Sequence, residues 1–334
     1  MRRLPTTLGI ALVLAGGWLV TTEAYLKYGV RVGDRQVTLK WHSMPIRYYV
    51  NDQVPPGITP SAFREAVDRA FSSWAAVPTG GVSFQNAGSI SAEPSEQDGA
   101  STIGFLPRPD LDRVLGATSY VVDTLTGDIV ETDIFLNSTF PWSTAPGGDV
   151  GRFDVESIAL HEIGHLVGLG HSALGETEVR ATGGRRVIAA ASVMFPIAFS
   201  AGSVEGRRLQ PDDIAGVSDI YAGPGFASGT GSLSGRVTKD GRGVFGAHVV
   251  AFNPATGALV GNFTLDESGA FAIAGLEPGT HIIRVEPLDD ADLSSFFSDA
   301  QAVDLRFAVT YFDRLVVVPR GGNAGPIEIK VAAR

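Results

Sequence analysis

No cysteine occurs anywhere in this chain of 334 residues. The absence excludes disulfide bonds, thiolate metal ligands, cysteine nucleophiles and lipid attachment to an N-terminal cysteine. Any metal site must therefore be built from nitrogen and oxygen ligands. The lack of disulfides does not place the chain in the cytosol, because large exported domains can fold on their hydrophobic cores alone.

Positive charge is also scarce. The chain carries 26 lysines and arginines against 36 aspartates and glutamates, a formal net charge of -10, and no basic run follows Arg3. A nucleic acid is therefore not an expected partner. With 44% hydrophobic and 19% charged residues, the composition is typical of a folded globular protein, and the length favours two domains.

The most apolar stretch, residues 8–20, is short for a membrane-spanning helix, which needs about 20 residues. It follows two arginines and has the length of a signal-peptide core. Small residues at Thr22 and Ala24 favour cleavage after Ala24. We therefore predict a signal peptide over residues 1–24 and a secreted, extracellular protein. An uncleaved segment would anchor the same domains outside the membrane.

The first two thirds of the chain mix strand-like and helix-like patterns. Residues 37–50 and several pieces between 82 and 136 have the alternation and turn residues of strands. Helices are predicted from apolar residues at helical spacing behind a capping residue or a proline, at about 59–74, 155–169 and 211–221. This mixture predicts an α+β domain over residues 25–222.

Glycine and serine are frequent in residues 223–232, which we predict to be a flexible linker. Beyond it the chain has no long helical pattern. Short apolar runs alternate with turn sequences such as KDG at 239–241 and DESG at 266–269. Residues 233–334 are therefore predicted to form a second, all-β sandwich domain.

Three of the six histidines lie within residues 161–171, HEIGHLVGLGH. On a helix, His161 and His165 are four residues apart and share one face, with Glu162 beside them. Gly168 allows a sharp turn that returns His171 as a third ligand. Three imidazoles suit zinc and leave a fourth position for water, which is the arrangement of a catalytic site.

This segment predicts hydrolysis. Zinc lowers the pKa of water from about 15.7 to about 7 and polarises a carbonyl. Glu162 is the candidate general base, which accepts the proton of the water and then donates it to the leaving amine. HExxH alone also occurs by chance, and an inactive relative would retain the ligands, but Gly168 and His171 at this spacing favour catalysis.

With Met194 downstream, the segment resembles the metzincin signature, in which HExxHxxGxxH precedes a methionine turn. Within that clan the sequence is similar to the matrixins, the matrix-metalloproteinase family. The similarity rests on Ser172 after the third histidine, on SVMFP at 192–196 and on LQPDDI at 209–214. It covers roughly residues 37–222.

The resemblance implies a twisted, mixed five-stranded sheet backed by helices, with a polypeptide substrate lying along the antiparallel edge strand. Leu115, Gly116 and Ala117 match the position of that strand, where a peptide would add by main-chain pairing. The resemblance also implies one catalytic Zn2+ ion and a hydrogen bond from the methionine turn to Asp213. A plain helix cap is the alternative interpretation of Asp213.

Several features of the sequence differ from those of the animal matrixins. The sequence has no cysteine for an inhibitory propeptide, and no histidine between His42 and His161 for a second, structural zinc, which we expect to be missing. Ala198 occupies a position where matrixins often have a tyrosine, so the cleavage preference of the family is not expected to apply to this chain. Ca2+ is left open, because five aspartates offer hard oxygen ligands yet equally suit solvated turns: Asp110, Asp112, Asp123, Asp128 and Asp133.

Residues 232–285 resemble the carboxypeptidase regulatory-like β-sandwich, with GAHV at 246–249 and LEPG at 276–279. Such modules are usually accessory. His248 and His281 lie in strand-like contexts and are interpreted as packing or surface residues.

Together these features predict a secreted zinc metalloendopeptidase acting on extended polypeptides, with a β-sandwich that could bind a surface or matrix ligand. One alternative is an inactive zinc-binding relic that serves as an adhesion protein through its sandwich, and another is a zinc hydrolase of nonpeptide substrates. The intact Glu162 disfavours the first, and an edge strand suited to peptides disfavours the second. The physiological substrate and the oligomeric state stay unknown.

Overall fold

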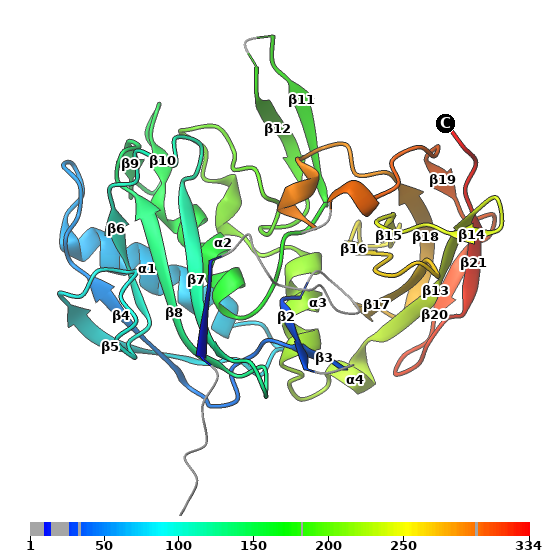
Figure 1. Cartoon of the computed structure of the whole chain (residues 1–334), viewed down its shortest axis with the longest axis horizontal. Helices are drawn as coiled ribbons and strands as arrows, with labels where there is room; N and C mark the ends of the chain where they lie inside the picture. The colour runs from blue at the N-terminus through cyan, green and yellow to red at the C-terminus, as the bar shows by residue number, and fades with distance from the viewer. Residues whose placement is uncertain (1–9, 15–26, 33–34, 182, 298–299) are drawn as a thin grey trace, which may run out of the picture.

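The computed structural model describes residues 10–14, 27–32, 35–181, 183–297 and 300–334. Figure 1 shows an N-terminal lobe of strands and helices beside a C-terminal lobe of strands. The predicted cleavage after Ala24 lies outside the described residues. No helix in the described ranges is long and apolar enough to cross a membrane.

The N-terminal lobe is built on one mixed sheet with strand order β1-β7-β8-β6-β4-β5. Strands β4, β5, β6 and β8 run parallel, and β7 pairs antiparallel with β8. The predicted mixed five-stranded sheet is therefore present, and β1 adds a sixth strand along residues 119–123 of β7. The strands of this lobe are β1 (Ile10–Leu14), β2 (Gly29–Val32), β3 (Arg35–Thr38), β4 (Ile46–Asn51), β5 (Phe84–Ile90), β6 (Thr102–Leu106), β7 (Gly116–Asp123), β8 (Ile129–Asn137), β9 (Trp142–Ser143), β10 (Phe153–Asp154), β11 (Gly175–Val179) and β12 (Arg185–Ala190).

Helices α1 (Pro60–Ala75) and α2 (Val155–Leu166) pack against each other in this lobe. The Thr59 hydroxyl caps α1 by accepting a hydrogen bond from the backbone N–H of Ala62 at 3.2 Å. The apolar stripe predicted for α1 is buried, and Trp74 donates its indole N–H to the carbonyl of Leu160 at 2.9 Å. Burial of such side chains contributes about 1.5–3 kcal/mol each and fixes α2 against α1.

Helix α2 ends at Leu166, three residues earlier than the sequence predicts. The reason is Gly168, whose φ of +95° lies in the left-handed region. A side chain there would also clash with the carbonyl of Leu39. The chain therefore turns sharply after α2 and passes through Gly170 to His171.

The C-terminal lobe contains two sheets, with orders β14-β13-β17 and β16-β15-β18-β19; β21 also pairs with β13, and β20 with β18. Apolar residues of both sheets, such as Ile273 and Ile283, share one core. The strands are β13 (Gly231–Lys239), β14 (Arg242–Gly243), β15 (His248–Phe252), β16 (Leu259–Phe263), β17 (Ala270–Leu276), β18 (Gly279–Glu286), β19 (Thr310–Tyr311), β20 (Val316–Val318) and β21 (Ile327–Lys330). Short 3-10 turns, η2 (Leu293–Ser295) and η3 (Ala300–Ala302), lie between β18 and β19.

The residues expected to be a flexible linker contain regular secondary structure. They contain helix α4 (Phe226–Gly229), where Phe226 is buried, and the beginning of β13, where Gly231 pairs with Leu276. Helix α3 (Pro211–Ile220) contacts β16 and β17, and its Ala215 is buried in the C-terminal core. The two lobes are therefore joined by packing as well as by the chain.

Candidate metal centre

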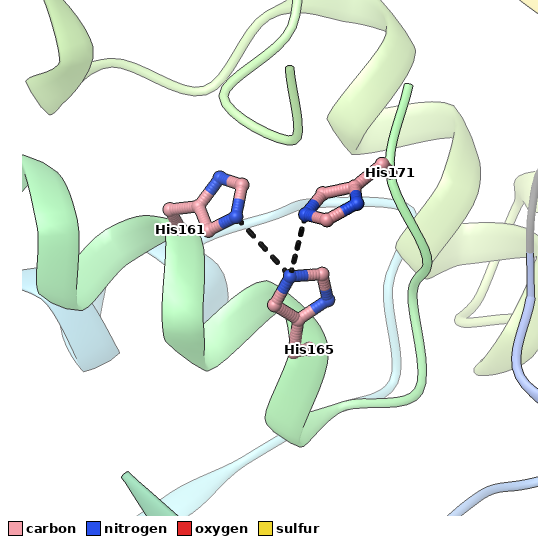
Figure 2. A group of neighbouring side chains, drawn as sticks. All are labelled: His161, His165 and His171. Atoms are coloured by element: carbon pink, nitrogen blue, oxygen red, sulfur yellow. Dashed lines mark hydrogen bonds between the residues drawn. The ribbon is translucent and has the colours of Figure 1, made fainter. Parts of the chain in front are cut away.

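The three histidines of the signature converge on one point (Figure 2). Nε2 of His165 lies 3.1 Å from Nε2 of His161 and 3.2 Å from Nε2 of His171. Two imidazoles on a tetrahedral zinc ion, each about 2.0–2.1 Å away, would have nitrogens about 3.4 Å apart. The observed spacing fits zinc, and this is the one potential metal-holding cluster of three or more His, Asp or Glu side chains among the residues that the structure describes.

Each imidazole is oriented by a main-chain carbonyl on its other nitrogen. Nδ1 of His161 lies 2.7 Å from the carbonyl of Val193, and Nδ1 of His165 lies 2.8 Å from that of Leu169. Nδ1 of His171 lies 2.7 Å from the carbonyl of Ser295. A carbonyl can only accept, so each Nδ1 carries the proton and each Nε2 lone pair is free for a metal.

The surroundings also keep the histidines neutral. Burial lowers the pKa of His161 to about 3, and the neighbouring His171 adds to this shift. Burial, followed by the two other histidines, holds the pKa of His165 well below its ordinary value. Neutral imidazole is the form that binds zinc.

Glu162 is buried beside the histidines and points toward β7. Its Oε2 accepts a hydrogen bond from the Thr118 hydroxyl at 2.8 Å. A Cβ atom built on Gly116 would lie 3.1 Å from Oε1 and 3.1 Å from the carbonyl oxygen of Phe135, so the glycine lets the β7 backbone pass close to the carboxylate without crowding it. Burial raises the pKa of the Glu162 carboxyl to about 7, against a smaller lowering by Thr118. A carboxyl near neutrality is suited to accept and return a proton.

Met194 is buried beneath α2, where a side chain at Gly164 would overlap its sulfur. Asp213 holds this turn from α3. Its carboxylate accepts hydrogen bonds from the Ser192 hydroxyl at 2.6 Å and from the Val193 and Met194 amides at 2.9 and 3.3 Å. The same carboxylate accepts from the backbone N–H of Gln210 at the start of α3, so it both caps the helix and supports the turn.

A cleft of about 940 Å³ borders the histidines. Both lobes contribute to its walls. Its lining includes Leu115, Gly116 and Ala117 at the start of β7, Val193 and Pro196 of the methionine turn, Val179 and Arg185 of the β11–β12 hairpin, and Asp292 and Ser295 of the C-terminal lobe.

The aspartates considered for calcium do not gather at one place. Asp110 pairs with Arg108 at 2.6 Å, Asp128 lies 3.0 Å from Nδ1 of His42, and Asp133 accepts from the Thr102 amide at 2.9 Å. Asp123 caps its own turn by accepting from the Leu125 amide, and Asp112 is exposed. A calcium site stays an untested prediction.

The two histidines of the C-terminal lobe are buried and lie outside the metal centre. Nδ1 of His248 lies 3.0 Å from a carboxylate oxygen of Glu286, and Nδ1 of His281 lies 3.1 Å from the carbonyl of Gly279.

Several contacts of the centre were not anticipated from the sequence. Thr118 and Ser295 contact the site although both lie far from residues 161–171 in the sequence. Tyr120 donates its hydroxyl to the carbonyl of His165 at 2.6 Å. The Trp41 indole N–H donates to the carbonyl of Leu166 at 2.9 Å. No local pattern marks such residues, because their role depends on tertiary contacts.

Plant metalloendoproteinases are among the known proteins with similar sequences. Metalloendoproteinase 5-MMP of Arabidopsis thaliana is 37% identical over 86 residues, which are 26% of this chain and 19% of that protein. Metalloendoproteinase 2-MMP of the same plant is 31% identical over 126 residues, 34% of this chain and 26% of that protein. Metalloendoproteinase 1 of Glycine max is 29% identical over 178 residues, 48% of this chain and 45% of that protein. The matches span less than half of each relative.

The sequence profile of the matrixin family, Peptidase_M10, matches residues 40–222. This range includes the three histidines, Glu162, Met194 and Asp213. The family and the three-nitrogen ligand set agree on one catalytic zinc ion. The chain belongs to the matrixin family of zinc metalloendopeptidases.

Proposed function

We propose that this protein is a secreted endopeptidase that cuts extended polypeptides, with Glu162 as its general base. The observation that carries the proposal is the position of the Glu162 carboxylate. It lines the same cleft as the three histidines, lies beside Gly116 at the start of β7, and is within hydrogen-bond distance of Thr118.

A zinc ion held by the three histidines would supply Lewis acidity toward a substrate carbonyl and the attacking water. Glu162 then accepts the proton of that water and delivers it to the amine that leaves. His161, His165 and His171 hold the metal, and Asp213 with Met194 supports the turn beneath it. The low polarity of the buried setting strengthens the charge interactions of the carboxylate.

The substrate is proposed to bind by pairing with the start of β7. Strand β1 lies within the proposed signal peptide, so its removal would leave the edge of β7 that faces away from β8 open to a substrate, from Leu115, Gly116 and Ala117 onward, with Gly116 beside Glu162. Main-chain pairing recognises any extended polypeptide, whereas nonpeptide substrates offer no such pairing.

We propose residues 1–24 as the signal peptide, 25–222 as the catalytic domain and 233–334 as a carboxypeptidase regulatory-like sandwich, joined through the short ordered segment 223–232. The sandwich is proposed to bind a surface or matrix ligand. In support, four large apolar side chains are exposed on the β19–β20 side of this lobe: Val309, Tyr311, Leu315 and Val317.

The test is incubation of the purified chain with an unfolded polypeptide, followed by mass spectrometry of new chain ends. Cleavage that stops with a chelator and returns with zinc supports the endopeptidase. A chain that binds zinc but cuts no unfolded polypeptide would favour the adhesion protein instead.

A further inference from the structure

We propose that the C-terminal lobe completes the zinc centre, and that the main-chain carbonyl of Ser295 is a positioning group for His171. The segment responsible is residues 287–297, which follows β18 and contains η2, and which we name the strap. The inference rests on zinc binding by the three histidines and assigns part of that site to the second lobe.

The first step is the source of the three orienting carbonyls. Those that accept from His161 and His165 belong to Val193 and Leu169 of the N-terminal lobe. The carbonyl that accepts from His171 belongs to Ser295, 124 residues further along the chain. His171 follows the Gly168 turn and lies outside α2, so no helix fixes its ring.

The second step is that the strap is built to hold this carbonyl in place. The Ser295 amide donates to the carbonyl of Asp292 at 2.9 Å, and the amides of Phe296 and Phe297 donate to the carbonyl of Leu293 at 3.0 and 2.9 Å. Both phenylalanines are buried in a cluster that includes Phe195 of the methionine turn. The Ser295 carbonyl is therefore fixed by packing from both lobes.

The third step is that polar contacts join the two lobes at the strap and also away from it. Asp290 accepts from the Thr177 amide of β11 through its carboxylate at 2.8 Å, and from the Thr177 hydroxyl through its carbonyl at 2.8 Å. On α3, the Asp212 carboxylate accepts from the Gly261 amide of β16 at 2.9 Å. Separation of the lobes would break these bonds and remove the acceptor from His171 together.

Zinc affinity and docking of the C-terminal lobe are therefore coupled. Removing the hydrogen-bond partner of a metal-bound histidine typically lowers metal affinity 10- to 100-fold. By linkage, bound zinc stabilises the docked strap to the same extent.

The test changes one backbone atom in the full chain. Phenyllactic acid in place of Phe296 turns the Ser295 carbonyl into an ester carbonyl, a weaker acceptor, and removes one hydrogen bond to Leu293. The matched control carries phenyllactic acid in place of Phe297, which also removes one hydrogen bond to Leu293 but leaves the Ser295 carbonyl an amide. Zinc affinity is measured by competition with a chelator.

We expect zinc affinity to fall about tenfold for the ester at Phe296 and to stay unchanged for the ester at Phe297. Equal affinities in the two variants, whether both retained or both reduced, would overturn the role of Ser295, because η2 loses one hydrogen bond in each. Absence of zinc binding by the unmodified chain would instead overturn the metal site itself.

Discussion

At the scale of single residues, the Glu162 carboxylate has one side-chain hydrogen-bond donor in the described structure, the Thr118 hydroxyl. The same hydroxyl lies 3.1 Å from the carbonyl oxygen of Glu162, so its single proton is within reach of both acceptors of this residue. Its position on β7 links the proposed base to the proposed substrate strand.

We predict that Thr118→Val retains zinc but loses catalytic rate. Hydrogen bonds to charged groups contribute about 1.5–3 kcal/mol, so kcat should fall roughly 10- to 100-fold with little change in KM. Steady-state cleavage of a peptide and metal analysis give both values. Thr126→Val, in a turn away from the centre, serves as the control; a Thr118→Val enzyme with unchanged kcat would contradict the positioning role.

Asp133 on β8 should give stability a pH dependence. Burial raises its pKa from the ordinary 3.8 to about 7, partly offset by the Thr102 amide. The folded state then holds a proton that the unfolded state has lost, so the free energy of unfolding falls as pH rises from about 4 to 7 and levels off above. This shift limits the effect to about 4 kcal/mol.

Asp133→Asn removes this titration while its amide oxygen can still accept from Thr102. Relative to the unchanged chain, the variant should gain stability as pH rises from 4 to 8, measured by urea unfolding at each pH. A stability difference that is the same at every pH would show that Asp133 is ionised in both states.

At the scale of elements, α2 and the methionine turn are packed through a single glycine. A methyl group at Gly164 would overlap the sulfur of Met194 and approach the ring of Trp74. The helix would have to move away from both, which also displaces His161 and His165.

Gly164→Ala should therefore lower the free energy of unfolding by about 1–3 kcal/mol through overpacking, although alanine has the higher helix propensity. Urea denaturation measures the change. Gly147→Ala is the matched control, because nothing lies within 4 Å of a Cβ built there and its φ is not positive. If Gly164→Ala had the same free energy of unfolding as Gly147→Ala, the Met194 side chain would be able to move aside without loss of stability.

At the scale of the whole molecule, the lobes share an apolar interface. Ala215 of α3 is buried in the C-terminal core, and Phe195 packs in a cluster with Phe263, Phe296 and Phe297. The C-terminal lobe is therefore packed against the N-terminal lobe through apolar side chains.

We predict that the chain unfolds in one calorimetric transition and that Ala215→Glu separates it into two. A buried carboxylate without a partner costs several kcal/mol, so the lobes would part. Ala227→Glu, on the exposed side of α4, should keep a single transition. Two transitions in the unchanged chain would show that the lobes fold independently.

Local patterns account for much of this architecture. The apolar spacing of α1 and the histidine spacing around Gly168 depend on residues within a few turns, and both predictions agree with the structure. The Ser295 contact could not be foreseen, because a main-chain carbonyl carries no sequence signal and tertiary packing brings it to His171. The linker prediction did not include α4, because Phe226 lies against Gly275 of the second lobe, a tertiary contact that no local pattern shows.

The most direct test of the central proposal compares Glu162→Ala with His165→Ala in cleavage of an unfolded polypeptide, with bound zinc measured in both. Glu162→Ala should keep its zinc and lose activity by about 10²- to 10⁴-fold, the usual contribution of a general base, whereas His165→Ala should lose zinc and activity together. Equal loss of zinc in both variants, or full activity in Glu162→Ala, would contradict the assignment of Glu162 as the base.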